Sequence, residues 1–115
     1  MFIGMQTLPL IYIDNNTSHI LENISVTFDR DKGKIPSIKI LKPGARKLIS
    51  LFNMNVTGIT PLYLMHENKK LKIMERQYIF ENFTKDFRGT ILVEIKGIKH
   101  DGRFDITVVE NFSLH

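Results

Sequence analysis

Apolar and polar residues alternate in short runs along most of the chain, and residues that favour turns separate the runs. Ile24, Val26 and Phe28, for example, fall on one side of an extended chain, and the residues between them are polar. A period of two residues is typical of a β-strand that buries one face. The runs that predict strands are residues 10–13, 20–29, 36–41, 47–52, 60–67, 70–74, 91–98 and 104–108.

The segments between these runs carry residues with turn-forming geometry. Residues 14–16 are expected to close the first strand, and residues 31–34 are expected to turn the chain after the second. Pro43-Gly44 fits the centre of a type II turn, because Pro fixes φ at the first central position and Gly accepts a positive φ at the second.

The last two strands pose a problem of register, because Ile98 is out of phase with the apolar residues before it. A three-residue loop at 100–102 and one extra residue at Gly97 together restore the phase. Such loops favour Gly in the left-handed region, and a Gly inside a strand often marks a bulge. The pairs expected from this hairpin are Ile98–Phe104, Ile95–Ile106 and Val93–Val108.

Two segments fit more than one structure. Phe80, Phe83 and Phe87 have helical spacing, which allows a short helix or an ordered loop over residues 79–88, with the three rings plugging one end of a core. Residues 46–53 fit either a helix or a strand, and the preceding Pro-Gly pair favours the strand.

Composition supports a β protein. The 115 residues include 16 Ile and 8 Phe but only one Ala, and β-branched and aromatic residues suit a pleated, half-buried surface better than a helix. The length is ordinary for one domain, so we treat residues 1–115 as a single unit. About eight short strands joined by tight turns predict an all-β fold, an antiparallel sandwich of two sheets packed face to face.

Part of the chain resembles a known family. Residues 15–51 follow the pattern of an Asn-rich start, a strand, a Gly-containing turn and a Pro-Gly before the next strand, which resembles bacterial immunoglobulin-like sandwich modules of the FxLYD kind. The resemblance implies an accessory or interaction domain and carries over no site. The residues that carry it are Asn15, Asn16, Leu21, Asn23, Ile24, Val26, Phe28, Asp31, Gly33, Leu41, Pro43 and Gly44.

The chain lacks the residue groupings that catalysis and cofactor binding use. It has no Cys, and its four His residues are scattered singly without the spacing of metal ligands. Neither a Ser elbow nor a Gly-rich phosphate loop is present. We therefore expect no cofactor, no metal and no enzymatic activity. The pair His100-Asp101 is interpreted as a turn. A deep polar pocket that unites two or more of His66, Glu67, His100 and Asp101 would indicate an enzyme.

The net charge of +4 is mildly basic and fits either nucleic-acid binding or the Lys- and Asn-rich composition that an AT-rich genome produces. The densest basic cluster lies at residues 69–76, with Tyr78 nearby. Its cations could contact phosphates, and the Tyr78 ring could stack on a base. If residues 70–74 form a strand, Leu71 and Ile73 point inward. This possible binding patch consists of Lys69, Lys70, Lys72 and Arg76.

These features favour a non-enzymatic interaction module whose partner is a protein that docks at a sheet edge or an apolar patch. The alternative is a small basic β domain that binds nucleic acid. The N-terminal residues lack the basic start of a signal peptide, and no run is long enough to span a membrane. We expect a cytoplasmic protein if the chain is full length, and an extracytoplasmic one if it is a trimmed exported module.

Overall fold

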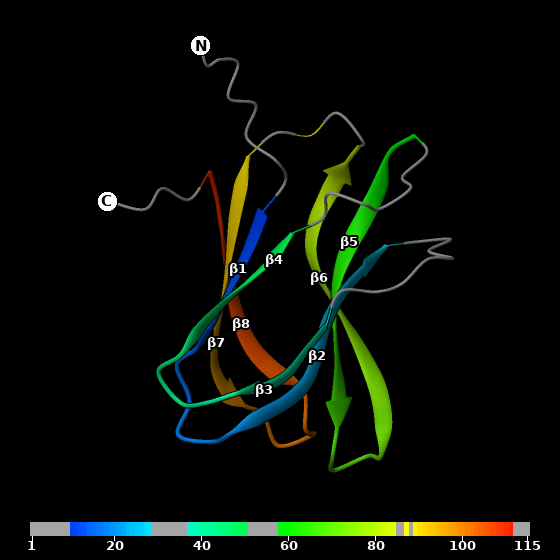
Figure 1. The fold of residues 1–115 in the computed structure, drawn as a ribbon. Helices are drawn as coiled ribbons and strands as arrows, with labels where there is room; N and C mark the ends of the chain where they lie inside the picture. The colour runs from blue at the N-terminus through cyan, green and yellow to red at the C-terminus, as the bar shows by residue number, and fades with distance from the viewer. Residues whose placement is uncertain (1–9, 29–36, 51–57, 85–86, 88, 112–115) are drawn as a thin grey trace.

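The computed structural model describes residues 10–28, 37–50, 58–84, 87 and 89–111. These residues form β-strands and no helix (Figure 1). The strands are β1 (Leu10–Asn15), β2 (Leu21–Phe28), β3 (Ser37–Leu41), β4 (Arg46–Ser50), β5 (Thr60–Asn68), β6 (Ile73–Phe83), β7 (Thr90–Ile98) and β8 (Phe104–Glu110). No helix long and apolar enough to cross a membrane occurs among the described residues.

The strands form two four-stranded sheets that pack face to face (Figure 1). The first, here called the β1 sheet, has the order β4-β1-β7-β8, and the second, the β2 sheet, has the order β3-β2-β5-β6. The chain crosses between the sheets several times, so each sheet contains strands from both halves of the sequence. The prediction of an all-β sandwich of two sheets is confirmed.

The expectation that all pairs are antiparallel is wrong for one pair. Strands β1 and β7 run parallel, with Ile11 opposite Ile91 and Ile13 opposite Val93. Two strands joined by a hairpin must run antiparallel, but β1 and β7 lie far apart in the sequence and can pair in either direction. The β1 sheet is therefore mixed, while the β2 sheet is antiparallel throughout.

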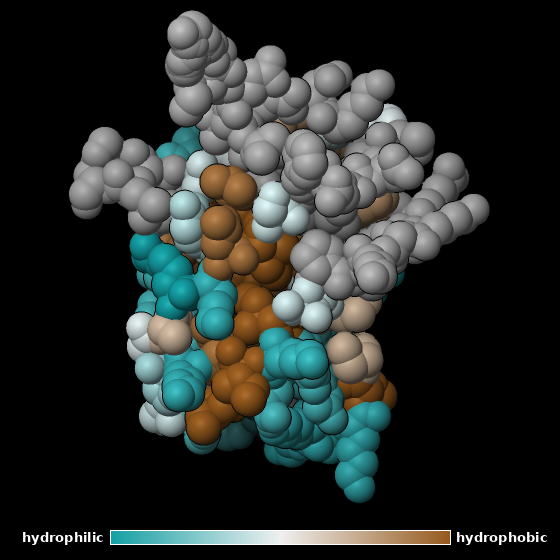
Figure 2. All heavy atoms as spheres, viewed as in Figure 1, coloured by the Kyte–Doolittle hydropathy of each residue, from teal (hydrophilic) through white to brown (hydrophobic). Residues whose placement is uncertain are grey.

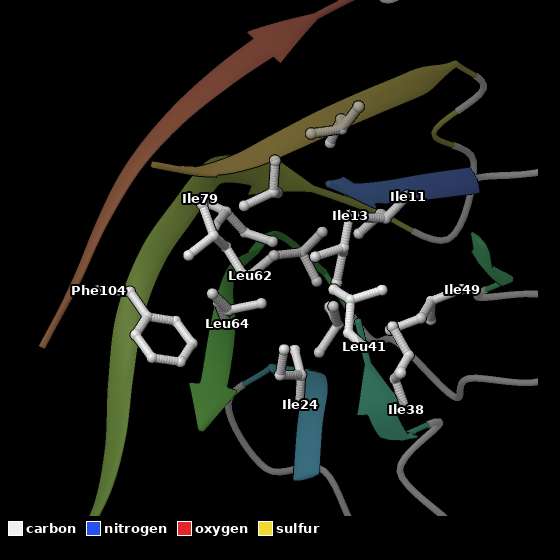
Figure 3. Close-up of a cluster of buried hydrophobic side chains, with 14 of the residues drawn as sticks. Ile11, Ile13, Ile24, Ile38, Leu41, Ile49, Leu62, Leu64, Ile79 and Phe104 are labelled. Carbon is white, nitrogen blue, oxygen red and sulfur yellow. The ribbon is translucent and has the colours of Figure 1, made fainter. Parts of the chain in front are cut away.

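The core lies between the sheets and is built from the inward residues of both. Figure 3 shows Ile13 of the β1 sheet close to Leu41 and Leu62 of the β2 sheet. Burying an aliphatic or aromatic side chain of this size stabilises the fold by ~1.5–3 kcal/mol. The buried cluster comprises Ile11, Ile13, Ile49, Ile91, Val93, Ile95 and Phe104 from one sheet and Leu21, Ile24, Val26, Phe28, Ile38, Leu41, Leu62, Leu64, Ile79 and Phe83 from the other.

The strand pairs of the C-terminal hairpin are as predicted, but the bulge lies one residue earlier than expected, at Lys96 instead of Gly97. Ile98 lies opposite Phe104, and the pairing shifts by one residue between Ile95 and Gly97, so that Lys96 is the extra residue of the bulge. The amide N–H of Lys99 donates to the carbonyl of Arg103 at 2.7 Å and so closes a three-residue loop. Gly102 in that loop has a φ of 89°, in the left-handed region.

The predicted type II turn also forms. The amide of Ala45 donates to the carbonyl of Lys42 at 3.0 Å, and Gly44 has a φ of 78°. Residues 46–50 of the segment that fits helix or strand form β4, and residues 51–53 lie outside the described part of the chain. The turn expected at residues 31–34 also lies outside it.

The helix allowed over residues 79–88 is wrong, because β6 continues through Phe83. Two irregularities in the pairing of β5 with β6 change the phase of β6, so Phe80 and Phe83 can both approach the core although they are three residues apart. The ring centre of Phe87 lies 5.0 Å from that of Phe80 and 5.5 Å from that of Phe83. The three rings pack together against the core, as predicted.

Candidate binding groove

The turns from β1 to β2, from β5 to β6 and from β7 to β8 lie at the same end of the sandwich, the lower end in Figure 1. Three buried side-chain amides bond one sheet to the other at this end. They belong to Asn15, Asn68 and Gln77.

Asn15 joins the end of β1 to the β2 sheet. Its Nδ2 donates to the carbonyl of Leu41 at 2.8 Å and to that of His19 at 2.7 Å, and its Oδ1 accepts from the amide of Thr17 at 2.9 Å. Asn15 is fully buried and still belongs to β1, as does Asp14. The turn expected at residues 14–16 therefore begins later, because both polar residues are satisfied within the strand.

Asn68 joins the β5–β6 turn to the β7–β8 hairpin. Its Oδ1 accepts from the amides of Lys70 and Leu71, each at 3.0 Å, and its Nδ2 donates to the carbonyl of Asp101 at 2.9 Å. Gly102 packs directly on this amide: a Cβ added there would lie 2.0 Å from Asn68 Oδ1. The contact requires a residue without a side chain, and the positive φ of Gly102 favours Gly independently.

Gln77 of β6 bonds to the backbone of Phe104 as a neighbouring strand would. Its Nε2 donates to the carbonyl of Phe104 and its Oε1 accepts from the amide of Phe104, both at 2.9 Å. The same Oε1 lies 2.7 Å from Nε2 of His66. Since Phe104 fixes the orientation of the amide, His66 must donate from Nε2. The His66 ring also stacks on the Phe104 ring, with 3.6 Å between centres.

A groove of about 300 Å³ opens between these turns. Its apolar part combines the buried Leu21 and Phe104 with Ile20 and Ile98, which are half exposed. Charged residues from three turns surround this apolar part. The groove is lined by His19, Ile20, Leu21, Glu22, Glu67, Lys69, Lys70, Ile98, Lys99, Gly102 and Phe104.

The lysines of the groove differ in their partners. The Nζ of Lys69 donates to Glu22 Oε1 at 2.9 Å, and this hydrogen bond raises the pKa of Lys69 above its ordinary value. Lys70 and Lys99 form no ion pair with a described residue. Both also line a second hollow, which contains His100 and Asp101. Three lysines stand against two carboxylates, Glu22 and Glu67, in the lining, so the groove has a net charge of +1 with His19 neutral. Since Lys69 is paired with Glu22, the excess positive charge comes from Lys70 and Lys99.

The basic patch predicted from the sequence is divided in the structure. Lys69 and Lys70 reach the groove, whereas Lys72 lies in the β5–β6 turn with a φ of 57°. Arg76 lies on β6 with its guanidinium carbon 3.8 Å from the centre of the Tyr63 ring. Sequence reasoning did not identify Lys99, which only the hairpin brings to the other lysines.

The inward placement expected for Leu71 and Ile73 is wrong. Both side chains are about half exposed, at 52% and 49%. Residues 69–72 form a turn that Asn68 closes, with the amide of Lys72 donating to the carbonyl of Asn68 at 2.7 Å. A strand pattern cannot place Leu71, which lies in this turn, and Ile73 is only the first residue of β6 after it. Ile40 is also exposed, at 52%. Strict alternation from Ile38 would place Ile40 in the core, but Leu41 occupies the core position instead.

The residues that would indicate an enzyme are not united in a deep polar pocket. His66 is fully buried against Phe104, while His100 is exposed at the hairpin tip. Asp101 acts as a turn residue, since its Oδ1 accepts from the amide of Arg103 at 3.0 Å. No group of three potential metal ligands occurs in the part of the chain that the structure describes.

Comparison with known proteins supports the fold. No protein-family model and no curated protein matches the chain. An NMR structure of a protein from Eubacterium rectale is similar, with a TM-score of 0.50 over 88% of this chain and 87% of that one. The two sequences are 16% identical, so the similarity shows a shared architecture.

Replacing Gly102 by Ala tests the contact with Asn68. We expect Gly102→Ala to lower the free energy of unfolding by about 3 kcal/mol, through both the positive φ and the clash with a buried amide. Gly44→Ala is the matched control, because its φ is similar and a Cβ there meets nothing within 4 Å. The control should lose only about 1 kcal/mol. Equal losses in urea denaturation would contradict the contact.

Replacing Gln77 by Leu tests the bridge between the sheets. The variant leaves the amide and carbonyl of Phe104 and Nε2 of His66 without their partner, so we expect a loss of about 3 kcal/mol in the free energy of unfolding. Glu81→Leu, at an exposed position of the same strand, should change it by less than about 0.5 kcal/mol. Thermal and urea denaturation measure both, and a Gln77→Leu protein as stable as the control would refute the bridge.

Proposed function

We propose that the protein is a non-enzymatic interaction module that binds a protein partner by adding a strand to the open edge of β8. The resemblance of residues 15–51 to accessory sandwich modules of the FxLYD kind supports this class of function. The observation that carries the proposal is that β8 lacks the features that protect the other edge strands from pairing.

The four edge strands are β3, β4, β6 and β8. Natural sheets protect their edges with Lys, Pro, bulges or inward charges. Strand β3 carries Lys39, β4 carries Lys47, and the pairing of β6 is irregular. Strand β8, with the sequence FDITVVE, contains no Lys, Arg or Pro, and its own residues show no bulge. It is the edge best suited to receive another strand.

The backbone of β8 shows which residues would pair. Gln77 occupies the amide and carbonyl of Phe104, so these groups point away from β7. Backbone groups of an antiparallel strand alternate in direction, so those of Ile106 and Val108 point to the same open side. Among the described residues, no backbone group bonds to them there. An added strand would therefore begin beyond Phe104 and pair with Ile106 and Val108.

Peptides that bind the wild-type protein can be selected from a random display library and tested as synthetic twelve-residue peptides. We expect the selected peptides to slow hydrogen exchange at the amides of Ile106 and Val108. Val108→Pro removes an outward donor without removing a bond to β7 and should weaken binding about tenfold. Val108→Thr keeps both the donor and the branched shape and should bind as the wild type does. Protection elsewhere, or unchanged binding by Val108→Pro, would refute strand addition at β8.

A second candidate function, nucleic-acid binding, is favoured by an aromatic and cationic group on the outer face of the β2 sheet. Tyr78 is 54% exposed, and its ring centre lies 5.4 Å from that of Tyr63, over which Arg76 is placed. A single strand could stack a base on Tyr78 and place a phosphate near Arg76.

This second function predicts binding of a single-stranded oligonucleotide that falls steeply with salt. Tyr78→Ala should weaken the binding about fivefold or more, because one stacked base contributes ~1–3 kcal/mol. Lys47→Ala, on an edge strand of the other sheet, should have a much smaller effect. Fluorescence anisotropy between low and physiological salt measures all three proteins. Absence of binding at low salt would exclude the function.

A further inference from the structure

The groove at the turn end of the sandwich combines an apolar surface with two lysines that are available to a ligand. We propose that it binds a small amphipathic carboxylate, with the apolar body against Ile20 and Ile98 and the carboxylate near Lys70 and Lys99. The inference does not depend on strand addition at β8.

The size and lining of the groove favour a small ligand. A volume of about 300 Å³ lies at the lower end of the range for small-molecule sites, and such sites are mostly apolar with a few polar groups that orient the ligand. Leu21 and Phe104 are 4% exposed, while Ile20 and Ile98 are 56% and 44% exposed. Ile20 and Ile98 therefore supply the apolar surface that a ligand can reach without displacement of the core.

The charges select the sign of the ligand. Lys69 is paired with Glu22, whereas Lys70 and Lys99 have no such partner among the described residues. Both lysines also line the neighbouring hollow that contains His100 and Asp101, so they lie at the boundary between the groove and this hollow. The lining also contains the carboxylate of Glu67, so Lys70 and Lys99 leave an excess of one positive charge. This excess favours an anionic ligand over a cationic one.

The site is also held in place before a ligand arrives. Gln77 fixes the backbone of Phe104, and Asn68 ties the turn that carries Lys70 to the hairpin that carries Lys99. A site whose parts are already positioned loses less free energy on binding than one that must be ordered.

The test is a titration of the ¹⁵N-labelled full chain with octanoate well below micelle formation, followed by NMR chemical shifts. We expect saturable shifts at Leu21, Ile98 and Gly102. Octylamine should bind about tenfold or more weakly, since it carries the opposite charge, and acetate should give no saturable shift because it lacks the apolar body. The affinity for octanoate should fall as salt is added.

Variants separate this site from general hydrophobic binding. The double variant Lys70→Ala/Lys99→Ala should weaken octanoate binding about tenfold, at a factor of about two to five for each exposed charge contact. The matched double variant Lys39→Ala/Lys47→Ala removes two exposed lysines that do not line the groove and should bind normally. Ile20→Ser should weaken octanoate through the apolar contact alone.

Four results would overturn the proposal. They are no saturable binding of octanoate, octylamine binding as tightly as octanoate, equal weakening of octanoate binding by the two double variants, and shifts that spread beyond the groove along an apolar band on the surface. Figure 2 shows that band, which runs along the visible face between hydrophilic flanks. Shifts confined to the groove and lost in the Lys70→Ala/Lys99→Ala protein would support the proposal.

Discussion

Three buried side-chain amides determine how the two sheets of this sandwich sit against each other. The apolar core supplies most of the driving force for folding, but hydrophobic contact is not directional and permits several alignments of two sheets. Asn15, Asn68 and Gln77 each bond to a particular backbone group of the opposite sheet. A buried polar group that loses its partner costs ~1–3 kcal/mol, so any alignment that breaks these bonds is disfavoured.

The hydrogen bonds of these amides are concentrated at one end of the molecule, where the β7–β8 hairpin lies. Asn68 and Gln77 both hold the β7–β8 hairpin, one through Asp101 and the other through Phe104. The ion pair between Glu75 and Arg103, at 3.8 Å, reinforces the same junction, although partial exposure makes it weak. The groove lies between elements that these contacts fix, and for this reason residues distant in sequence can form one surface.

Strands, turns and the pairs of the C-terminal hairpin could be predicted from the sequence because each depends on local chemistry: alternation, the Pro43-Gly44 turn, and the parity that required one extra residue near Gly97. The parallel pairing of β1 with β7 could not, since strands far apart in sequence carry no signal of direction. The inter-sheet amides were missed for another reason. Parity places Asn68 on the buried face with Leu62 and Leu64, yet an amide buries only if a partner exists, and that partner comes from the other sheet.

Gln77 links the stability of the fold to its capacity for interaction. Its amide takes the place of a neighbouring strand at Phe104, so the first outward position of β8 is closed. The later outward positions, Ile106 and Val108, meet no such amide among the described residues, although their side chains still pack against the core. The bonds of Gln77 thus anchor β8 at Phe104 and occupy only this one position of its edge among the described residues. Under the proposed strand addition, Gln77 would therefore determine that a partner strand begins beyond Phe104.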